Sequence, residues 1–242
     1  MKPLKKILIV KMGTTLPALA ERRGDFDDWI QRLMGATSDR IQVVKPYEKD
    51  DLPDPSGLSG IIITGSHDMV TDRKEWSERT GAWLPSAIAT GVPLLGICYG
   101  HQLIAHVMGG SVGFNPSGSE FGTVDVQLGE HSDQNPLFDG FPPTIRVHVS
   151  HRQSVLSLPP KSTLLASSSK DPHQAYAIGE NVWGVQFHPE FDADITSAYI
   201  KACAEDLSAE GLNPNHLLGT VEDTPYGEHV LRRFGEIVIS RS

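Results

Sequence analysis

The sequence predicts an α/β fold built on a doubly wound, mostly parallel β-sheet with an antiparallel β extension. Two observations predict the parallel part: short aliphatic runs, typical of strands buried on both faces, and helix-period segments that lie between them. A third observation predicts the extension, which we expect to pack against the parallel sheet. After residue 110 the chain becomes a series of short strand-like runs that proline and glycine turns separate.

The first 108 residues alternate between predicted strands and predicted helices. The predicted strands cover 7–10, 41–44, 61–63 and 94–97, and the predicted helices cover 25–34, 76–89 and 101–108. Ligands of such sheets bind beyond the carboxyl ends of the strands. We therefore expect Gly65, Ser66 and Cys98, which lie at or just beyond strand ends, to share one crevice.

The second half predicts five more strands and two helices. The strands cover 123–128, 145–149, 163–167, 175–178 and 182–187; a helix at 194–207, a polar loop at 213–223 and an amphipathic helix at 228–239 follow. No linker, internal repeat or low-complexity tract divides the chain. We expect one domain over 1–242, with a core over about 5–207 and a C-terminal helical extension over about 208–242.

Composition narrows the class of protein. The formal net charge of -9 argues against a nucleic-acid or anionic-membrane surface, and two cysteines in 242 residues do not make a disulfide framework. The apolar run at 7–10 is too short for a signal peptide, and no stretch approaches the ~20 apolar residues of a membrane span. We therefore expect a cytoplasmic protein. We also expect no cofactor and no metal, because the sequence contains neither a Cys/His metal cluster nor a phosphate-binding loop.

Residues 96–100, Gly-Ile-Cys-Tyr-Gly, join the predicted strand 94–97 to the helix that follows. A cysteine between two glycines at such a turn is typical of a nucleophile elbow, because glycine permits the sharp turn that lifts the sulfur clear of the sheet. The positive end of the following helix favours the thiolate. Cys98 is therefore the predicted nucleophile. Cys203 lies in a helical pattern and is interpreted as a core residue.

A second segment, His188-Pro189-Glu190, supplies the groups that a thiolate nucleophile needs. Residues i and i+2 of an extended segment project to the same side, so the Glu190 carboxylate can orient the His188 imidazole. Taken alone, the segment is equally compatible with a surface turn. Together with the elbow it favours covalent catalysis over a binding module.

The chain thus resembles the class I glutamine amidotransferases. Residues 96–102 (Gly-Ile-Cys-Tyr-Gly-His-Gln) and 184–190 (Gly-Val-Gln-Phe-His-Pro-Glu) look like the two signatures of that family, and 61–66 (Ile-Ile-Ile-Thr-Gly-Ser) resembles its third segment. The resemblance spans roughly residues 5–200 and implies the family's flavodoxin-like sheet. Relatives of this size include proteins similar to the amidotransferase domain of GMP synthetase, and γ-glutamyl peptidases.

The resemblance also implies roles for individual residues. Cys98 would attack the side-chain carbonyl of glutamine, His188 would protonate the departing amine and then activate water, and Glu190 would orient His188. The backbone N–H groups of Gly65 and Tyr99 would hold the oxyanion. The remaining family positions imply substrate contacts for Gln102, Phe121, Gly122, Ser150 and His151.

Simpler interpretations stand beside these roles. Gln102 also fits a helix-capping or surface residue, and Ser150-His151 also fits a turn at a strand end. Many relatives carry Gly-Gly-Pro or Gly-Gly where this chain has Thr64-Gly65-Ser66, and His67 follows, a difference that bears on the pocket rim. We interpret His67 as an exposed loop residue rather than a catalytic one.

Three functions remain open on the sequence. The first is hydrolysis of glutamine to glutamate and ammonia, with the ammonia passed to a separate synthetase subunit, since this chain has no room for a synthetase domain. The second is a γ-glutamyl peptidase with the same triad, which needs a wider pocket. The third is a non-catalytic regulatory protein on this scaffold, which the intact triad argues against. A protease-like elbow-cysteine protein shares the elbow but fits less well, because the downstream His-Pro-Glu segment favours the amidotransferases.

Overall fold

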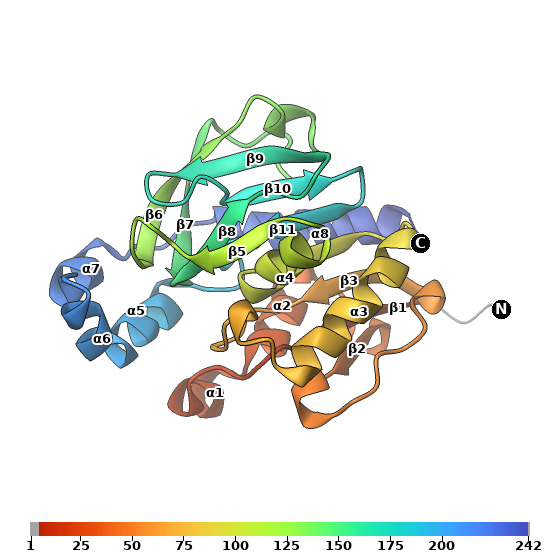
Figure 1. Cartoon of the computed structure of the whole chain (residues 1–242), viewed down its shortest axis with the longest axis horizontal. Coiled ribbons are helices and arrows are strands. Elements are labelled where there is room, and N and C mark those ends of the chain that lie inside the picture. The colour runs from red at the N-terminus through yellow and green to blue at the C-terminus, as the bar shows by residue number, and fades with distance from the viewer. Residues whose placement is uncertain (1–4, 242) are drawn as a thin grey trace.

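A nine-stranded β-sheet runs through the computed structural model, which describes residues 5–241 (Figure 1). Its strands are β1 (Lys6–Val10), β2 (Ile41–Val44), β3 (Leu58–Ile63), β4 (Leu94–Ile97), β6 (Glu120–Leu128), β7 (Thr144–His151), β9 (Ser162–Ser168), β10 (Ala175–Ile178) and β11 (Val182–Val185). They lie in the order β2-β1-β3-β4-β11-β10-β9-β6-β7. The first five pair in parallel and the rest pair antiparallel.

The predicted doubly wound α/β fold with an antiparallel extension is confirmed. The extension continues the same sheet rather than packing against it, because β11 pairs in parallel with β4 on one side and antiparallel with β10 on the other. A separate two-stranded sheet of β5 (Ser111–Phe114) and β8 (Gln153–Ser157) was not predicted. Its first strand is half-buried or exposed, so the sequence there lacks the aliphatic run of a buried strand.

Two helices cover each face of the parallel half of the sheet (Figure 1). On one face lie α2 (Phe26–Met34) and α8 (Tyr226–Ser240); on the other lie α3 (Glu75–Ala89) and α4 (Tyr99–Val107). The strand β1 shows why: Ile7 and Ile9 belong to the core with α2 and α8, whereas Leu8 and Val10 belong to the core with α3 and α4. Alternate side chains of a strand point to opposite faces, so an unbroken aliphatic run fills both cores.

The helices after residue 190 differ from the prediction. The predicted helix 194–207 is divided at Cys203 into α5 (Ala193–Ala202) and α6 (Ala204–Ala209). The predicted loop 213–223 contains α7 (Pro214–Thr220), and a further helix, α1 (Pro17–Arg23), was not predicted. The start of α7 did carry a signal, because Asn213 Oδ1 accepts the N–H groups of residues 215 and 216 and Pro214 is suited to a first helical position.

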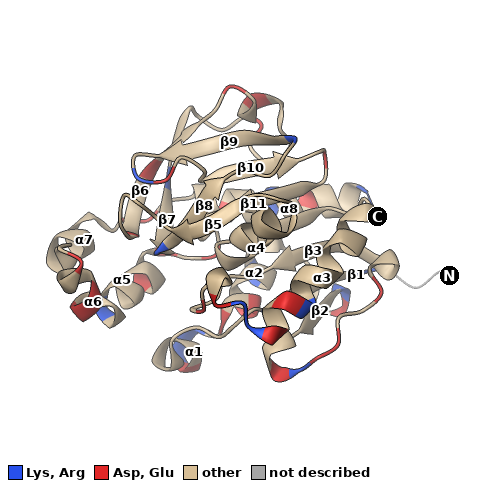
Figure 2. Cartoon of the chain, viewed as in Figure 1, with Lys and Arg blue, Asp and Glu red and all other residues tan. Residues whose placement is uncertain are grey.

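Positively and negatively charged residues lie close together along the chain near the start of α3 (Figure 2). Ion pairs join Arg73 to Glu78 and Lys74 to Asp68 there. Within residues 5–241, no helix has the length and apolar character to cross a membrane. The described residues also contain no group of three His, Cys, Asp or Glu side chains placed to hold a metal ion.

Candidate active site

The candidate nucleophile Cys98 lies between the end of β4 and the start of α4, with φ 48° and ψ -98°. This positive φ is strained for a residue with a side chain, and strained backbone of this kind gathers at functional sites. The sequence suggested that the flanking glycines supply the turn, but neither Gly96 nor Gly100 has a positive φ. They permit close approach instead: a Cβ on Gly96 would lie 2.6 Å from the carbonyl oxygen of Gly100.

The glycine at position 96 therefore gives a prediction about folding. Gly96→Ala places a methyl group against backbone that cannot move away, and we expect it to lower the free energy of unfolding by about 1–3 kcal/mol. Chemical denaturation measures the change. Gly219→Ala is the matched control, because a Cβ there meets no atom within 4 Å. Equal midpoints for the Gly96→Ala and wild-type proteins would contradict the close approach.

The candidate triad comes together at the carboxyl end of the sheet. His188 and Glu190 follow β11, the strand that pairs with the one leading to Cys98. His188 Nδ1 lies 2.8 Å from Glu190 Oε1, and both side chains are buried. A Cβ on Gly65 would lie 2.9 Å from His188 Cε1 and 3.7 Å from the Cβ of Cys98, so this glycine packs against both.

The electrostatics of this group favour a charged imidazole. Burial opposes the charged form, but the negative charges of Glu190 and Cys98 outweigh it and raise the pKa of His188 to about 10. The ring is stacked on Phe191, with centroids 4.0 Å apart, and lies near-parallel to Phe26 at 6.5 Å. At neutral pH the arrangement therefore holds an imidazolium, oriented by a carboxylate and adjacent to a cysteine sulfur.

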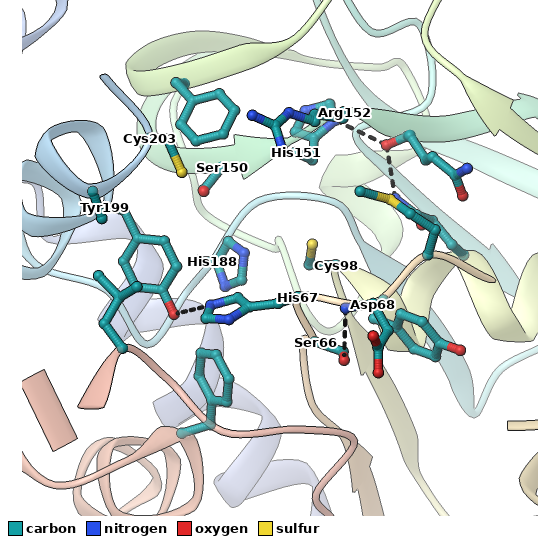
Figure 3. A pocket seen from close by; sticks show the side chains of 18 residues that line it. Ser66, His67, Asp68, Cys98, Ser150, His151, Arg152, His188, Tyr199 and Cys203 are labelled. Carbon is teal, nitrogen blue, oxygen red and sulfur yellow. Dashed lines mark hydrogen bonds between the residues drawn. The ribbon is translucent and has the colours of Figure 1, made fainter. Parts of the chain in front are cut away.

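A cavity of about 180 Å³ opens onto Cys98 and His188 (Figure 3). Four of the five expected substrate contacts line it: Gln102, Phe121, Ser150 and His151. The fifth, Gly122, does not; it has φ 108° in β6, beside the lining residue Phe121. The sequence motifs, far apart in the chain, thus meet around one cavity.

Gln102 is neither a cap nor a surface residue. Its side chain is buried and donates hydrogen bonds to the Gln153 carbonyl oxygen (2.7 Å) and to Gln186 Oε1 (2.9 Å). These bonds fix the first turn of α4 against β8 and the end of β11. Because Gln102 Nε2 donates both of these hydrogen bonds, the rest of the side chain is the part available to line the cavity.

A second buried imidazole–carboxylate pair, which the sequence did not predict, supports the cavity wall. His151 Nε2 lies 3.1 Å from Glu120 Oε2, and its Nδ1 lies 3.0 Å from the carbonyl oxygen of Gln153. Glu120 also accepts hydrogen bonds from Ser168 Oγ (2.7 Å) and Gln174 Nε2 (2.6 Å). The pair follows from the register of β6 and β7, which places Glu120 opposite His151, and no local motif contains that register.

Two residues to which the sequence assigned no role in the site, His67 and Cys203, also line the cavity. His67 is exposed, as expected, but its ring contributes to the cavity and its Nε2 lies 3.0 Å from the hydroxyl of Tyr199 (Figure 3). Cys203 is half-buried and lines the cavity rather than filling a core, which corrects the sequence interpretation. The break between α5 and α6 at Cys203 explains this, because a continuous helical face was the reason for placing it in a core.

Comparison with known proteins places this architecture in a family. The family model described as "Glutamine amidotransferase class-I" matches residues 24–205. A glutamine-hydrolyzing GMP synthase subunit of Pyrococcus furiosus is 43% identical over 120 residues, which are 47% of this chain and 62% of that protein. The corresponding GMP synthase subunit of Thermococcus kodakarensis is 35% identical over 183 residues, 72% of this chain and 89% of that protein.

Longer relatives match over a smaller share of their length. The glutamine-hydrolyzing GMP synthase of Porphyromonas gingivalis is 35% identical over 195 residues, and this chain spans 33% of it.

Solved structures show the same fold. A glutamine amidotransferase from Thermotoga maritima has a TM-score of 0.74 at 22% identity, covering 98% of this chain and 99% of that one. A glutamine amidotransferase from Methylobacillus flagellatus has a TM-score of 0.71 at 21% identity, covering 99% and 94%. With the family model matching most of its length, this chain belongs to the class I glutamine amidotransferases.

Proposed function

We propose that this chain hydrolyses the side-chain amide of glutamine to glutamate and ammonia through a thioester on Cys98. The observation that carries the proposal is the buried His188–Glu190 pair, 2.8 Å apart, beside a cysteine at the foot of a cavity. Membership of the class I glutamine amidotransferases supports it, as do relatives named as glutamine-hydrolyzing GMP synthase subunits.

The first half of the reaction forms the thioester. The Cys98 thiolate attacks the amide carbon and a C–S bond forms. The electron pair returns from the oxyanion, the C–N bond breaks, and the imidazolium of His188 gives its proton to the leaving nitrogen, so that ammonia departs. A raised pKa of His188, about 10, keeps that proton available at neutral pH.

The second half hydrolyses the thioester. Neutral His188 now accepts a proton from water, the oxygen attacks the thioester carbon, and the C–S bond breaks to give glutamate and regenerate the thiolate and imidazolium. In both halves the oxyanion would accept hydrogen bonds from the backbone N–H groups of Tyr99, the first residue of α4, and Gly65. The amino-acid end of glutamine would bind toward Gln102, Phe121, Gly122, Ser150 and His151.

The ammonia would pass to a synthetase carried on a separate chain. We infer this from the relatives named as GMP synthase subunits and from the Porphyromonas enzyme, of which this chain spans one third. Residues 1–242 would act as one amidotransferase domain, in the cytoplasm, where a reducing environment keeps Cys98 a free thiol.

The charge on Glu190 gives a prediction about pH. Because Glu190 raises the pKa of His188 above its ordinary 6.5, Glu190→Gln should lower that pKa. The leaving amine needs protonated His188, so the alkaline limb of the kcat/KM profile should move to lower pH, with a roughly hundredfold loss at the optimum. The exposed Glu180, changed to Gln, is the control. An unshifted alkaline limb would count against the pairing.

The proposal is tested by measuring glutamate and ammonia released from glutamine by the purified chain. We expect the two products in equal amounts, with little turnover when Cys98 is replaced by alanine. The assay is repeated after addition of a GMP synthase's synthetase subunit, which we expect to raise the rate. Absence of both products in both conditions would contradict the proposal.

A further inference from the structure

The cavity has two ends, which meet at Cys98 (Figure 3). One end carries Ser150 and His151, the family positions that the amino-acid end of glutamine would occupy. The other carries His67 and Tyr199, which are not among the substrate contacts expected from the sequence. Hydrolysis of glutamine itself gives this second end no role, because ammonia, the leaving group, carries no substituent that would need a binding site.

The second end lies on the side from which the leaving amine is protonated. Phe26 lies with its ring centroid 6.5 Å from that of His188 and also 6.5 Å from that of His67. Figure 3 shows the His67 ring beside that of His188, pointing toward Tyr199. A group attached to the leaving nitrogen would therefore enter the space beside His67.

His67 is held in place by a chain of hydroxyl groups. Its Nε2 lies 3.0 Å from the Tyr199 hydroxyl, which lies 2.9 Å from Thr15 Oγ1. The backbone N–H of Thr15 donates to Asp25 Oδ1 at 2.9 Å, and Asp25 is ion-paired with the buried Lys11. The ring is thus anchored to the body of the protein through α5 and the loop after β1.

The Tyr199 hydroxyl contacts only Nε2 of His67, so the other ring nitrogen, Nδ1, is available to a ligand. Although the residue as a whole is exposed, the loss of water around its cavity-lining ring and the neighbouring His188 lower the pKa of His67 below its ordinary 6.5, so the ring is neutral at pH 7 and carries one N–H. When the Tyr199 hydroxyl donates to Nε2, that proton resides on Nδ1. No described residue pairs with His67 Nδ1, and a carboxylate is a suitable acceptor for its N–H.

We propose that His67 and Tyr199 form a subsite for the amine portion of substituted γ-glutamyl amides, and that it recognises the carboxylate of a γ-glutamyl amino acid. The inference rests on the proposed Cys98 chemistry and extends it to a second substrate class. The bonds made and broken are those of the glutamine reaction, with an amino acid leaving in place of ammonia. Tyr199 acts by positioning His67, and His67 contacts the substrate.

The test compares γ-glutamylglycine with γ-glutamyl methylamide, which has the same bond to break but no carboxylate on the amine side. We expect the wild-type kcat/KM to favour γ-glutamylglycine by about tenfold, the size of effect that a hydrogen bond to an anion supplies. His67→Ala and Tyr199→Phe should each reduce this ratio about fivefold or more. The Tyr199→Phe change removes only the hydroxyl and keeps the ring that packs against Phe191.

Two substitutions outside the cavity serve as matched controls, His216→Ala in α7 and Tyr226→Phe in α8, and both should keep the wild-type ratio. Equal kcat/KM for the two amides in the wild type, or an unchanged ratio in both His67→Ala and Tyr199→Phe, would overturn the subsite.

A binding measurement separates failure of the subsite from failure of the chemistry. Calorimetry on the Cys98→Ala protein needs no turnover, and γ-glutamylglycine should bind about tenfold more tightly than the methylamide, a preference that adding His67→Ala removes. Preferential binding without turnover by the wild type would uphold the subsite and contradict the Cys98 reaction. Turnover of glutamine without preferential binding would do the reverse.

Discussion

Replacing Cys98 by alanine is expected to abolish turnover of glutamine, with a loss of about 10⁴-fold or more in kcat. The reason is that alanine removes the sulfur that forms the thioester, whereas the imidazolium and the oxyanion donors cannot substitute for it. The fold should survive, because alanine keeps the Cβ and the backbone conformation at φ 48° and loses only a small sulfur. Assays of glutamate release and thermal unfolding measure the two effects separately.

The other cysteine provides the matched control for this experiment. Cys203 lines the same cavity at the junction of α5 and α6, so Cys203→Ala tests whether loss of any thiol near the cavity suffices. We expect this variant to retain most of its turnover. A well-folded Cys98→Ala protein that still releases glutamate at a substantial rate would exclude the thioester route.

Replacing His188 by alanine is expected to reduce kcat by about 10³–10⁴-fold. This change removes the proton donor for the leaving amine and the base for water, and it also leaves Glu190 buried without its hydrogen-bond partner. Part of the loss can therefore reflect stability, since an unpaired buried carboxylate is costly. Unfolding curves for His188→Ala and for the double variant with Glu190→Gln separate the two contributions.

The ranking of the two variants tests the roles assigned to the pair. Glu190→Gln keeps the imidazole and disturbs its orientation and pKa, so it should reduce turnover less than His188→Ala. His106→Ala, half-buried in α4 and outside the cavity lining, should have little effect on turnover. A larger loss from Glu190→Gln than from His188→Ala would overturn the assignment of His188 as the proton carrier.

The parallel half of the fold could be predicted from the sequence because its strands are buried on both faces. Runs such as 7–10 and 61–63 are aliphatic throughout, and the strands form there. The strands β5 and β8 escaped prediction because their pattern lacks such a run; Phe114 and Leu156 within them are exposed. The helix α7 escaped because it is short and buries no side chain completely, so that its capping residues were its main signal.

In the candidate site, too, residues in short local motifs could be predicted, whereas contacts between distant segments could not. Cys98, His188 and Glu190 lie in short motifs whose spacing carries chemical information, and these motifs meet at the cavity. The partner of His151 could not be predicted, because Glu120 becomes its neighbour only through the pairing of β6 with β7. The contact between His67 and Tyr199 likewise joins a loop to a helix 132 residues further along the chain.

The central claim, a covalent γ-glutamyl intermediate on Cys98, is tested most directly by acid quenching during turnover. Wild-type protein is mixed with glutamine labelled in its carbon chain, quenched within one turnover, digested and examined by mass spectrometry. The account predicts one γ-glutamyl group on the peptide that contains Cys98, and none in the Cys98→Ala protein. Turnover without label on that peptide, or label that persists in the Cys98→Ala protein, would contradict it.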